Sequence, residues 1–252
     1  MPLMDEFKEE RAALKNGTLK EKISYFWYYY KWHVVAIIAI TFFVGSLIYE
    51  FATKKETAFY AVMMNASPMT SGEEYSQAFA DYAGIDLKEN EFFFDTSIRV
   101  GADDIIGDVN YTTMQKLTVY TAAAELDAMI TDTDSFQKYA NSYTFYDLRN
   151  ILTEEQIAAY EPYFYYVDWT TVEAIETANA SFDDSYVPTY KDPTKPEEME
   201  QPVPVGIYLN SCDDLLENFY FRGEDIAMGV YGNTTRLETT LKYIDFLMED
   251  AK

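Results

Sequence analysis

"LTVYTAAAELDAMITDTDSFQKYANSYTFYDL", residues 117–148, decides the fold class of this chain. A helical pattern runs into the short apolar stretch 126–132, which has the length and composition of a buried strand. A loop rich in Thr and Asp follows at 131–134, and a second helical pattern comes after it. A strand between two helices is the building unit of an α/β domain.

The same alternation continues along the chain. Apolar, β-branched and aromatic runs predict further strands at 58–66, 91–100, 163–169, 203–209 and 224–233. Helices between them are indicated by capping-box patterns that begin at Ser71, Thr112, Asp134, Thr153 and Thr235. The polar segment 170–202 contains four prolines and predicts an irregular insertion. Residues 58–252 are therefore expected to form one mixed, mainly parallel α/β sandwich domain.

A long apolar run lies near the N-terminus. Residues 32–51 form its predicted transmembrane part, and no charged residue occurs between Trp32 and Tyr49. Those eighteen residues span roughly 27 Å as a helix, close to the thickness of a hydrocarbon core. A dense group before the run is typical of a membrane interface and comprises Tyr25, Trp27, Tyr28, Tyr29, Lys31 and Trp32. The alternative is a helix buried in the protein core.

The sequence around the run predicts an uncleaved signal anchor. The leader is too long for the n-region of a signal peptide, and no A-x-A-like cleavage site follows. Four lysines precede the run closely and two follow it, which favours a cytoplasmic N-terminus. We expect a cytoplasmic helical segment at 1–31, a linker at 52–57 and an extracellular domain at 58–252.

Charge and composition exclude several function classes. The net charge of -24 belongs entirely to residues 53–252, because residues 1–52 hold six basic and six acidic residues. Such an acidic body repels a phosphate backbone, so no nucleic-acid partner is expected. One cysteine and one histidine predict neither a disulfide framework nor a zinc site, and no cofactor or metal is expected. Enzyme motifs are missing, although a glycosidase pair of distant carboxylates stays open.

Several residues resemble a known family. The order of elements is similar to that of extracellular solute-binding proteins of the type II periplasmic-binding fold. The matching positions are Asp127, Met129, Ile130, Phe136, Tyr139, Ala140, Asp147 and Leu148. The anchor resembles those of single-pass proteins of Gram-positive gut bacteria. The likeness covers about residues 58–250 and implies a membrane-bound protein with a single lobe of that fold.

This likeness has one large departure. A complete solute-binding protein closes its ligand between two lobes, and the second lobe is expected after about residue 169. Only the 33 residues of the segment 170–202 stand there, far fewer than the roughly 100 to 150 of a typical domain. A single lobe cannot close a cleft around a small ligand.

The candidate site residues lie in two groups. The loop group is Thr131, Asp132, Thr133 and Asp134, which suit hydroxyl or cation binding at the carboxyl end of a strand. The simpler interpretation is that Asp134 caps the next helix. In the second group, Tyr165 and Trp169 are expected to share one face of the strand 163–169, where they either stack on a ligand or partner or belong to the core.

Two functions follow from these patterns. The first is a non-catalytic, membrane-anchored extracellular module that binds another envelope protein. The second is an extracellular sensor or accessory subunit for a sugar, peptide or cation. The missing second lobe favours the first.

Overall fold

A computed structural model describes residues 18–100 and 107–249. The chain divides into two compact units, one up to Lys54 and one from Lys55 onward. Most of the predicted cytoplasmic segment, residues 1–17, lies outside the described residues, as do the side chains of Tyr25 and Tyr29.

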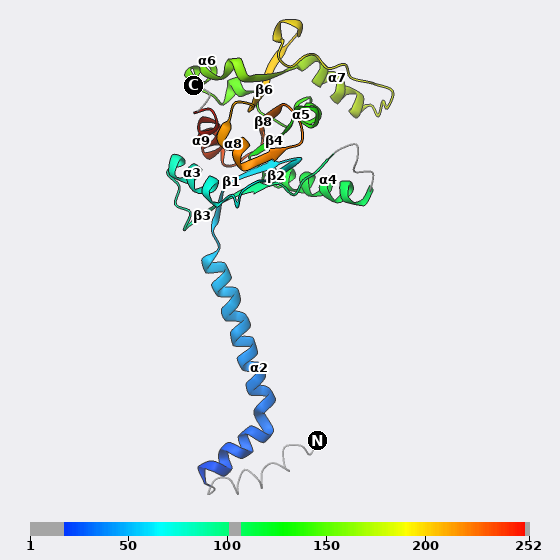
Figure 1. The fold of residues 1–252 in the computed structure, drawn as a ribbon. Coiled ribbons are helices and arrows are strands. Elements are labelled where there is room, and N and C mark those ends of the chain that lie inside the picture. Colours follow the sequence, from blue (N-terminus) through cyan, green and yellow to red (C-terminus); the bar gives the residue numbers. More distant parts are fainter. Residues whose placement is uncertain (1–17, 101–106, 250–252) are drawn as a thin grey trace. The chain divides into compact units, whose positions relative to one another are not determined.

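The first unit contains helix α2 (Leu19–Thr53), which continues from the polar leader into the apolar run without a break (Figure 1). Its part Tyr30–Thr53 has a mean hydropathy of 2.2, and none of it is buried within the protein. Twenty-four helical residues extend about 36 Å. In the described part of the chain this is the one helix that is long and apolar enough to cross a membrane, and a signal sequence would have the same properties.

The second unit is an α/β domain around a six-stranded mixed sheet with the order β3-β1-β4-β8-β6-β5. Its strands are β1 (Glu56–Met63), β3 (Asn90–Asp95), β4 (Ala128–Asp132), β5 (Phe164–Asp168), β6 (Pro202–Tyr208) and β8 (Ile226–Val230). The helices are α3 (Glu73–Ala83), α4 (Gly107–Ala122), α5 (Thr133–Ala140), α6 (Glu154–Tyr160), α7 (Trp169–Ala180), α8 (Asp213–Asn218) and α9 (Leu237–Leu247). Single 3-10 turns are η1 (Leu148–Asn150), η2 (Glu161–Tyr163) and η3 (Pro196–Glu198).

The sheet is mixed as predicted, but the expectation of mainly parallel strands is wrong. Strand β1 pairs in parallel with β3 and β4, whereas β4 with β8, β8 with β6, and β6 with β5 pair antiparallel. Central strands such as β4 and β8 are buried on both faces. An apolar run in the sequence indicates that a strand is buried, but it does not indicate whether the strand is parallel or antiparallel to its neighbours.

Helices cover both faces of the sheet (Figure 1). Buried side chains of α3, α6, α8 and α9 belong to one hydrophobic cluster with Phe59 of β1. Those of α4, α5 and α7 belong to a second cluster with Met129 of β4. A Cβ on Gly206 would lie 2.7 Å from the Phe136 ring, so only glycine lets α5 sit this close to β6.

The segment 170–202 is only partly irregular, which corrects its prediction. Its first part forms α7, because the Asp168 carboxylate accepts from the Thr170 N–H and caps the helix. The same carboxylate accepts from the backbone N–H groups of Glu200 and Gln201. All four prolines of the segment lie after Ala180, and between Ala180 and the start of β6 at Pro202 the only regular structure is the turn η3.

A second, two-stranded sheet pairs β2 (Ala66–Pro68) with β7 (Phe219–Phe221) in antiparallel register. Ala66, Phe219 and Phe221 turn one face into the core. Ser67 pairs with Tyr220 on the other face, where Tyr220 is 60 % exposed. The small sheet therefore carries an outward polar face.

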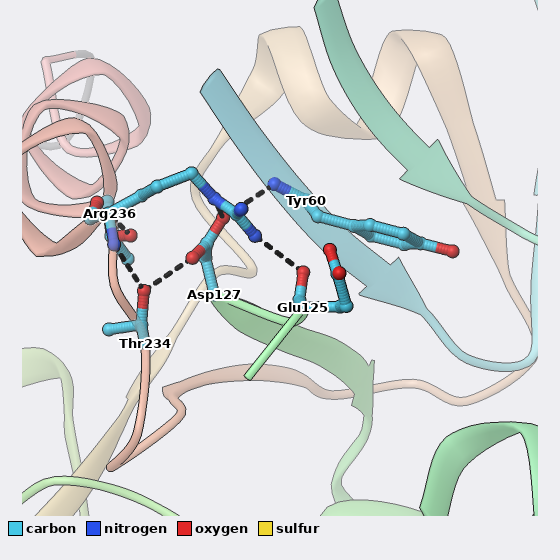
Figure 2. A network of polar contacts seen from close by, with 6 residues as sticks. Tyr60, Glu125, Asp127, Thr234 and Arg236 are labelled. Carbon is cyan, nitrogen blue, oxygen red and sulfur yellow. Dashed lines mark hydrogen bonds and ion pairs between the residues drawn. The ribbon is translucent and has the colours of Figure 1, made fainter. Parts of the chain in front are cut away.

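A buried ion pair joins distant parts of the domain (Figure 2). Asp127, just before β4, is fully buried, and its carboxylate lies 2.8 Å from Nε of Arg236. The backbone N–H of Tyr60 in β1 donates to the same carboxylate at 2.7 Å, and the Thr234 hydroxyl donates to its other oxygen. Arg236 also donates to the Glu125 carbonyl at 2.5 Å. These bonds hold together β1, the start of β4 and the chain that enters α9.

Removing the cation tests this interaction. We expect Arg236→Ala to lower the free energy of unfolding by about 3–5 kcal/mol, because it leaves a buried carboxylate unpaired. The matched control is Arg149→Ala, which breaks a pair with Asp147 whose arginine side chain is 49 % exposed. We expect the control to lose less than about 1 kcal/mol. Denaturant unfolding of the full chain in a mild detergent measures both, and equal losses would contradict the role of the buried pair.

Candidate functional site

The predicted 131–134 loop spans the junction of β4 and α5. Thr131 and Asp132 are the last residues of β4 and are buried, whereas Asp134 is exposed in the first turn of α5. The helix cap is Asp132, whose carboxylate accepts from the Ser135 N–H at 2.9 Å. The interpretation that Asp134 is the cap is therefore wrong, because the helix begins at Thr133.

The Asp132 carboxylate is held by groups of the protein itself. Its second oxygen accepts from Asn65 Nδ2 at 2.8 Å and from the Thr131 hydroxyl at 3.1 Å. Burial raises the pKa of Asp132, but hydrogen bonds from Asn65, Ser135 and Thr131 outweigh burial and lower the pKa overall. Asp132 is thus ionised and already bonded, which suits a support better than a ligand-binding group.

Asn65 connects this loop to the neighbouring strands. Its backbone has φ of 59°, a left-handed conformation that Asn adopts more readily than most residues. Its side-chain oxygen accepts from the Val100 N–H at 2.7 Å, and its Nδ2 also donates to the Ser135 hydroxyl at 2.9 Å. Asn65 therefore binds together the chain after β1, the end of β4 and the chain after β3.

A cavity of about 430 Å³ opens beside Asn65. It is lined by Asn65, Ser67, Arg99, Tyr220 and Arg222, and we call it the Arg99–Arg222 cavity. Ser67 and Tyr220 pair on the outward face of the small sheet, and Asn65 and Arg222 stand next to the ends of its two strands. Arg99 comes from the chain after β3, and its Nη2 donates to the Ser67 hydroxyl at 3.0 Å.

Gly223 allows the chain beside this cavity to pack directly against the 131–134 loop. A Cβ on Gly223, next to Arg222, would collide with the Cβ of Asp132. The capped end of β4 thus lies directly against the chain that carries Arg222. The predicted loop residues support the cavity from behind, and none of them lines it.

Two guanidinium groups belong to the described lining of the cavity. None of the described residues that line it is acidic, although the chain as a whole carries -24. Guanidinium groups present several N–H donors in a plane, which matches the two oxygens of a carboxylate or phosphate. The cavity also lies at the carboxyl ends of β1 and β4, the edge at which α/β sheets bind ligands.

The two predicted aromatic residues do not share a face. Tyr165 is buried in β5, with its ring 5.0 Å from that of Phe136, and burial raises its pKa far above the ordinary value. Trp169 is the first residue of α7, and its ring packs edge-on at 5.2 Å against the half-exposed Tyr143. The prediction of one strand face is wrong because Asp168 ends the strand and caps a helix.

No sequence pattern indicated the lining residues. Arg99 stands in a run predicted as strand, Arg222 in a predicted connection, and the three-residue strands β2 and β7 are too short to show a period. Cys212, the single cysteine, is buried and its thiol donates to the Leu247 carbonyl at 3.0 Å. No group of three His, Cys, Asp or Glu residues that could hold a metal occurs among the described residues.

Comparisons with known proteins identify no relative. No protein-family model matches the chain, and searches of the curated proteins and of the solved structures find no match either. Of the features expected from the family likeness, the structure supports two: an apolar helix, and an α/β domain with a mixed six-stranded sheet after it.

The cap gives a pH-dependent prediction. We expect Asp132→Ala to lower the free energy of unfolding by about 1–2 kcal/mol at pH 7, since it removes an N-cap. The matched variant Asp134→Ala removes an exposed carboxylate two residues away and should change stability by less than about 0.5 kcal/mol.

The pH dependence follows from the lowered pKa of Asp132. The contribution of the Asp132 charge to the free energy of unfolding is complete above the pKa of an unfolded Asp, about 3.9. It disappears as the pH falls through the lower pKa of Asp132 in the folded protein. Thermal unfolding of both variants between pH 7 and pH 2 measures this. A gap between wild type and Asp132→Ala that persists unchanged at pH 2 would show that the charge of Asp132 is not what stabilises the cap.

Proposed function

We propose that this protein is a membrane-anchored, non-catalytic interaction module of a bacterial cell envelope, with its N-terminus in the cytoplasm and its α/β domain outside the cell. The observation that carries the proposal is the contrast between the two units. No part of the apolar helix Tyr30–Thr53 is buried in the protein, whereas the domain from Lys55 onward has its own two-sided core. An unburied apolar helix requires lipid or another protein around it.

Three half-buried or buried carboxylates, Asp95, Asp132 and Asp168, do not have the pKa shift of a general acid. Burial raises the pKa of Asp95, but hydrogen bonds from Lys116, Ser97 and Tyr60 outweigh it and bring the pKa to about 2. The net shifts of Asp132 and Asp168 are also downward, and both residues cap helices. A general acid needs the opposite shift, toward the working pH.

Two exposed apolar side chains support contact with a protein partner. Phe182 is 90 % and Val187 81 % exposed, and both lie in the stretch that follows α7. Side chains of this size leave water when a partner covers them. The second candidate function, a sensor or accessory subunit that binds a ligand, is favoured by the Arg99–Arg222 cavity.

The anchor and its orientation can be tested with single cysteines. In a Cys212→Ser background, we compare Ser24→Cys, which precedes the apolar run, with Ser185→Cys, which lies in the exposed stretch after α7. We expect a membrane-impermeant maleimide to label Ser185→Cys in intact cells and Ser24→Cys only after lysis. An N-terminal tag should stay on the mature protein.

Two outcomes would contradict the proposal. Labelling of Ser24→Cys alone in intact cells would reverse the orientation. Loss of the N-terminal tag, with release of the domain from washed membranes, would show that the helix is a cleaved signal sequence.

The partner surface can be tested with photo-crosslinking in living cells. A photoreactive phenylalanine analogue at Phe182 should give a discrete adduct. The same analogue at Val119 of α4, also an exposed apolar position at 61 %, is the matched control and should give none. Equal adducts at both positions, or none at Phe182, would remove this stretch as the partner surface.

A further inference from the structure

We propose that Phe182 is the residue through which the domain docks onto its protein partner, and that its ring enters an apolar pocket with a basic rim. This inference rests on the proposed function, because it supposes a partner for the interaction module. It names the chemistry that the surface of the partner must have. It does not depend on the orientation of the membrane helix.

The backbone of Phe182 has a conformation that bulky residues avoid. Helix α7 ends in a Schellman turn, in which the Phe182 N–H donates to the Asn179 carbonyl at 3.2 Å and the Asp183 N–H donates to the Ala178 carbonyl at 2.9 Å. Such a turn places a left-handed residue directly after the helix, and that residue is usually glycine. Phe182 stands there with φ of 54°, an outlier for a side chain of its size.

The exposure of Phe182 adds to the strain of its backbone. At 90 %, its exposed fraction is the highest among the large apolar residues in the described part of the chain. Glycine or asparagine at this position would relieve the strain without loss of packing. Phe182 therefore combines two unfavourable features, a left-handed backbone and an apolar ring in water. Strain and apolar exposure at one residue indicate a role in binding.

Helix α7 holds Phe182 in a fixed place away from the core. Among the residues of α7, all of which the structure describes, only Val172 is buried. Figure 1 shows α7 and the chain after it at the periphery of the domain. Beyond the turn, the Asp183 carboxylate accepts from the N–H and the hydroxyl of Ser185. A side chain presented by an ordered turn reduces the entropy that binding costs.

The surroundings of Phe182 are acidic. Residues 173–190, all of them described, contain no Lys or Arg. Their acidic residues are all exposed and comprise Glu173, Glu176, Asp183 and Asp184. A partner that covers the Phe182 ring meets these carboxylates, so charge complementarity requires Lys or Arg around its pocket. A second copy of this chain or an anionic lipid would bring more negative charge instead, which favours a basic protein surface.

The first measurement separates a docking role from a structural one. The melting temperature of the full chain in a mild detergent is compared for wild type, Phe182→Ala and Phe182→Asn. Alanine removes the ring but keeps the left-handed strain, so we expect no change. Asparagine tolerates this conformation, and we expect it to raise the melting temperature by about 1–3 °C. A fall of several degrees in both variants would show that the ring holds the fold together and would overturn the proposal.

The second measurement is photo-crosslinking in the native cells, with a photoreactive phenylalanine analogue at Val187, which is 81 % exposed. The yield of the adduct is the readout. We expect Phe182→Asn and Phe182→Ala to reduce the yield about tenfold or more, as substitution of a central interface residue does. Phe182→Tyr keeps an aromatic ring and should retain most of the adduct. Val119→Ala removes another exposed apolar side chain and should crosslink like wild type.

The basic rim is tested in membranes isolated from the same cells. Raising the NaCl concentration from about 50 to about 500 mM should lower the adduct yield, because salt screens exposed charges. Asp183→Asn combined with Asp184→Asn should lower the yield at low salt and weaken its salt dependence. The matched control, Glu154→Gln combined with Glu155→Gln, removes the same charge from exposed positions of α6 and should behave like wild type.

Mass spectrometry of the adduct decides the chemistry of the partner. A crosslinked protein segment beside Lys or Arg residues supports the proposal. An adduct with lipid, with a second copy of this chain or with an acidic protein surface overturns it. An adduct that Phe182→Asn leaves unchanged also overturns it, although a partner on this stretch, and with it the proposed function, would stand. Failure to crosslink from both Phe182 and Val187 removes the partner surface itself.

Discussion

The buried carboxylate of Asp127 is the interaction on which the domain depends. A charge removed from water costs several kcal/mol unless it is paired and hydrogen-bonded. Here the compensation comes from Arg236, from Thr234 and from the backbone of Tyr60 in β1. The charge is therefore stable only when the parallel strands β1 and β4 and the returning chain before α9 are all in place. It links the first half of the fold to the last.

The position of Asp127 also determines the other end of β4. The parallel register pairs Ala61 with Ala128 and Met63 with Ile130, so β1 and β4 end side by side. Asn65 then meets Asp132, and the Asp132 carboxylate both caps α5 and accepts from Asn65. One short strand thus has a structural carboxylate at each end. The second of these carboxylates, Asp132, accepts from Asn65, and the Arg99–Arg222 cavity opens beside Asn65.

The local elements were largely predictable because their signals are local. The strand in the stretch 117–148 is confirmed as β4, flanked by α4 and α5, and the Thr153 capping box is present with both of its bonds. Strand direction was not predictable, since β8 enters the sheet between β4 and β6 through long-range pairing alone. The prediction that Tyr165 and Trp169 share one strand face is wrong for a related reason. Both faces of β5 are covered, so its alternation marks no exposed side.

The candidate site was predictable only as a location. Ligand sites at the carboxyl ends of parallel strands follow from the α/β pattern, and the cavity does lie at the ends of β1 and β4. Its lining depends on the β2–β7 pairing of two short segments far apart in the sequence. The acidic 131–134 loop resembles a binding site in the sequence because carboxylates commonly bind cations and hydroxyl groups. The structure uses its Asp132 to cap a helix and to hold Asn65.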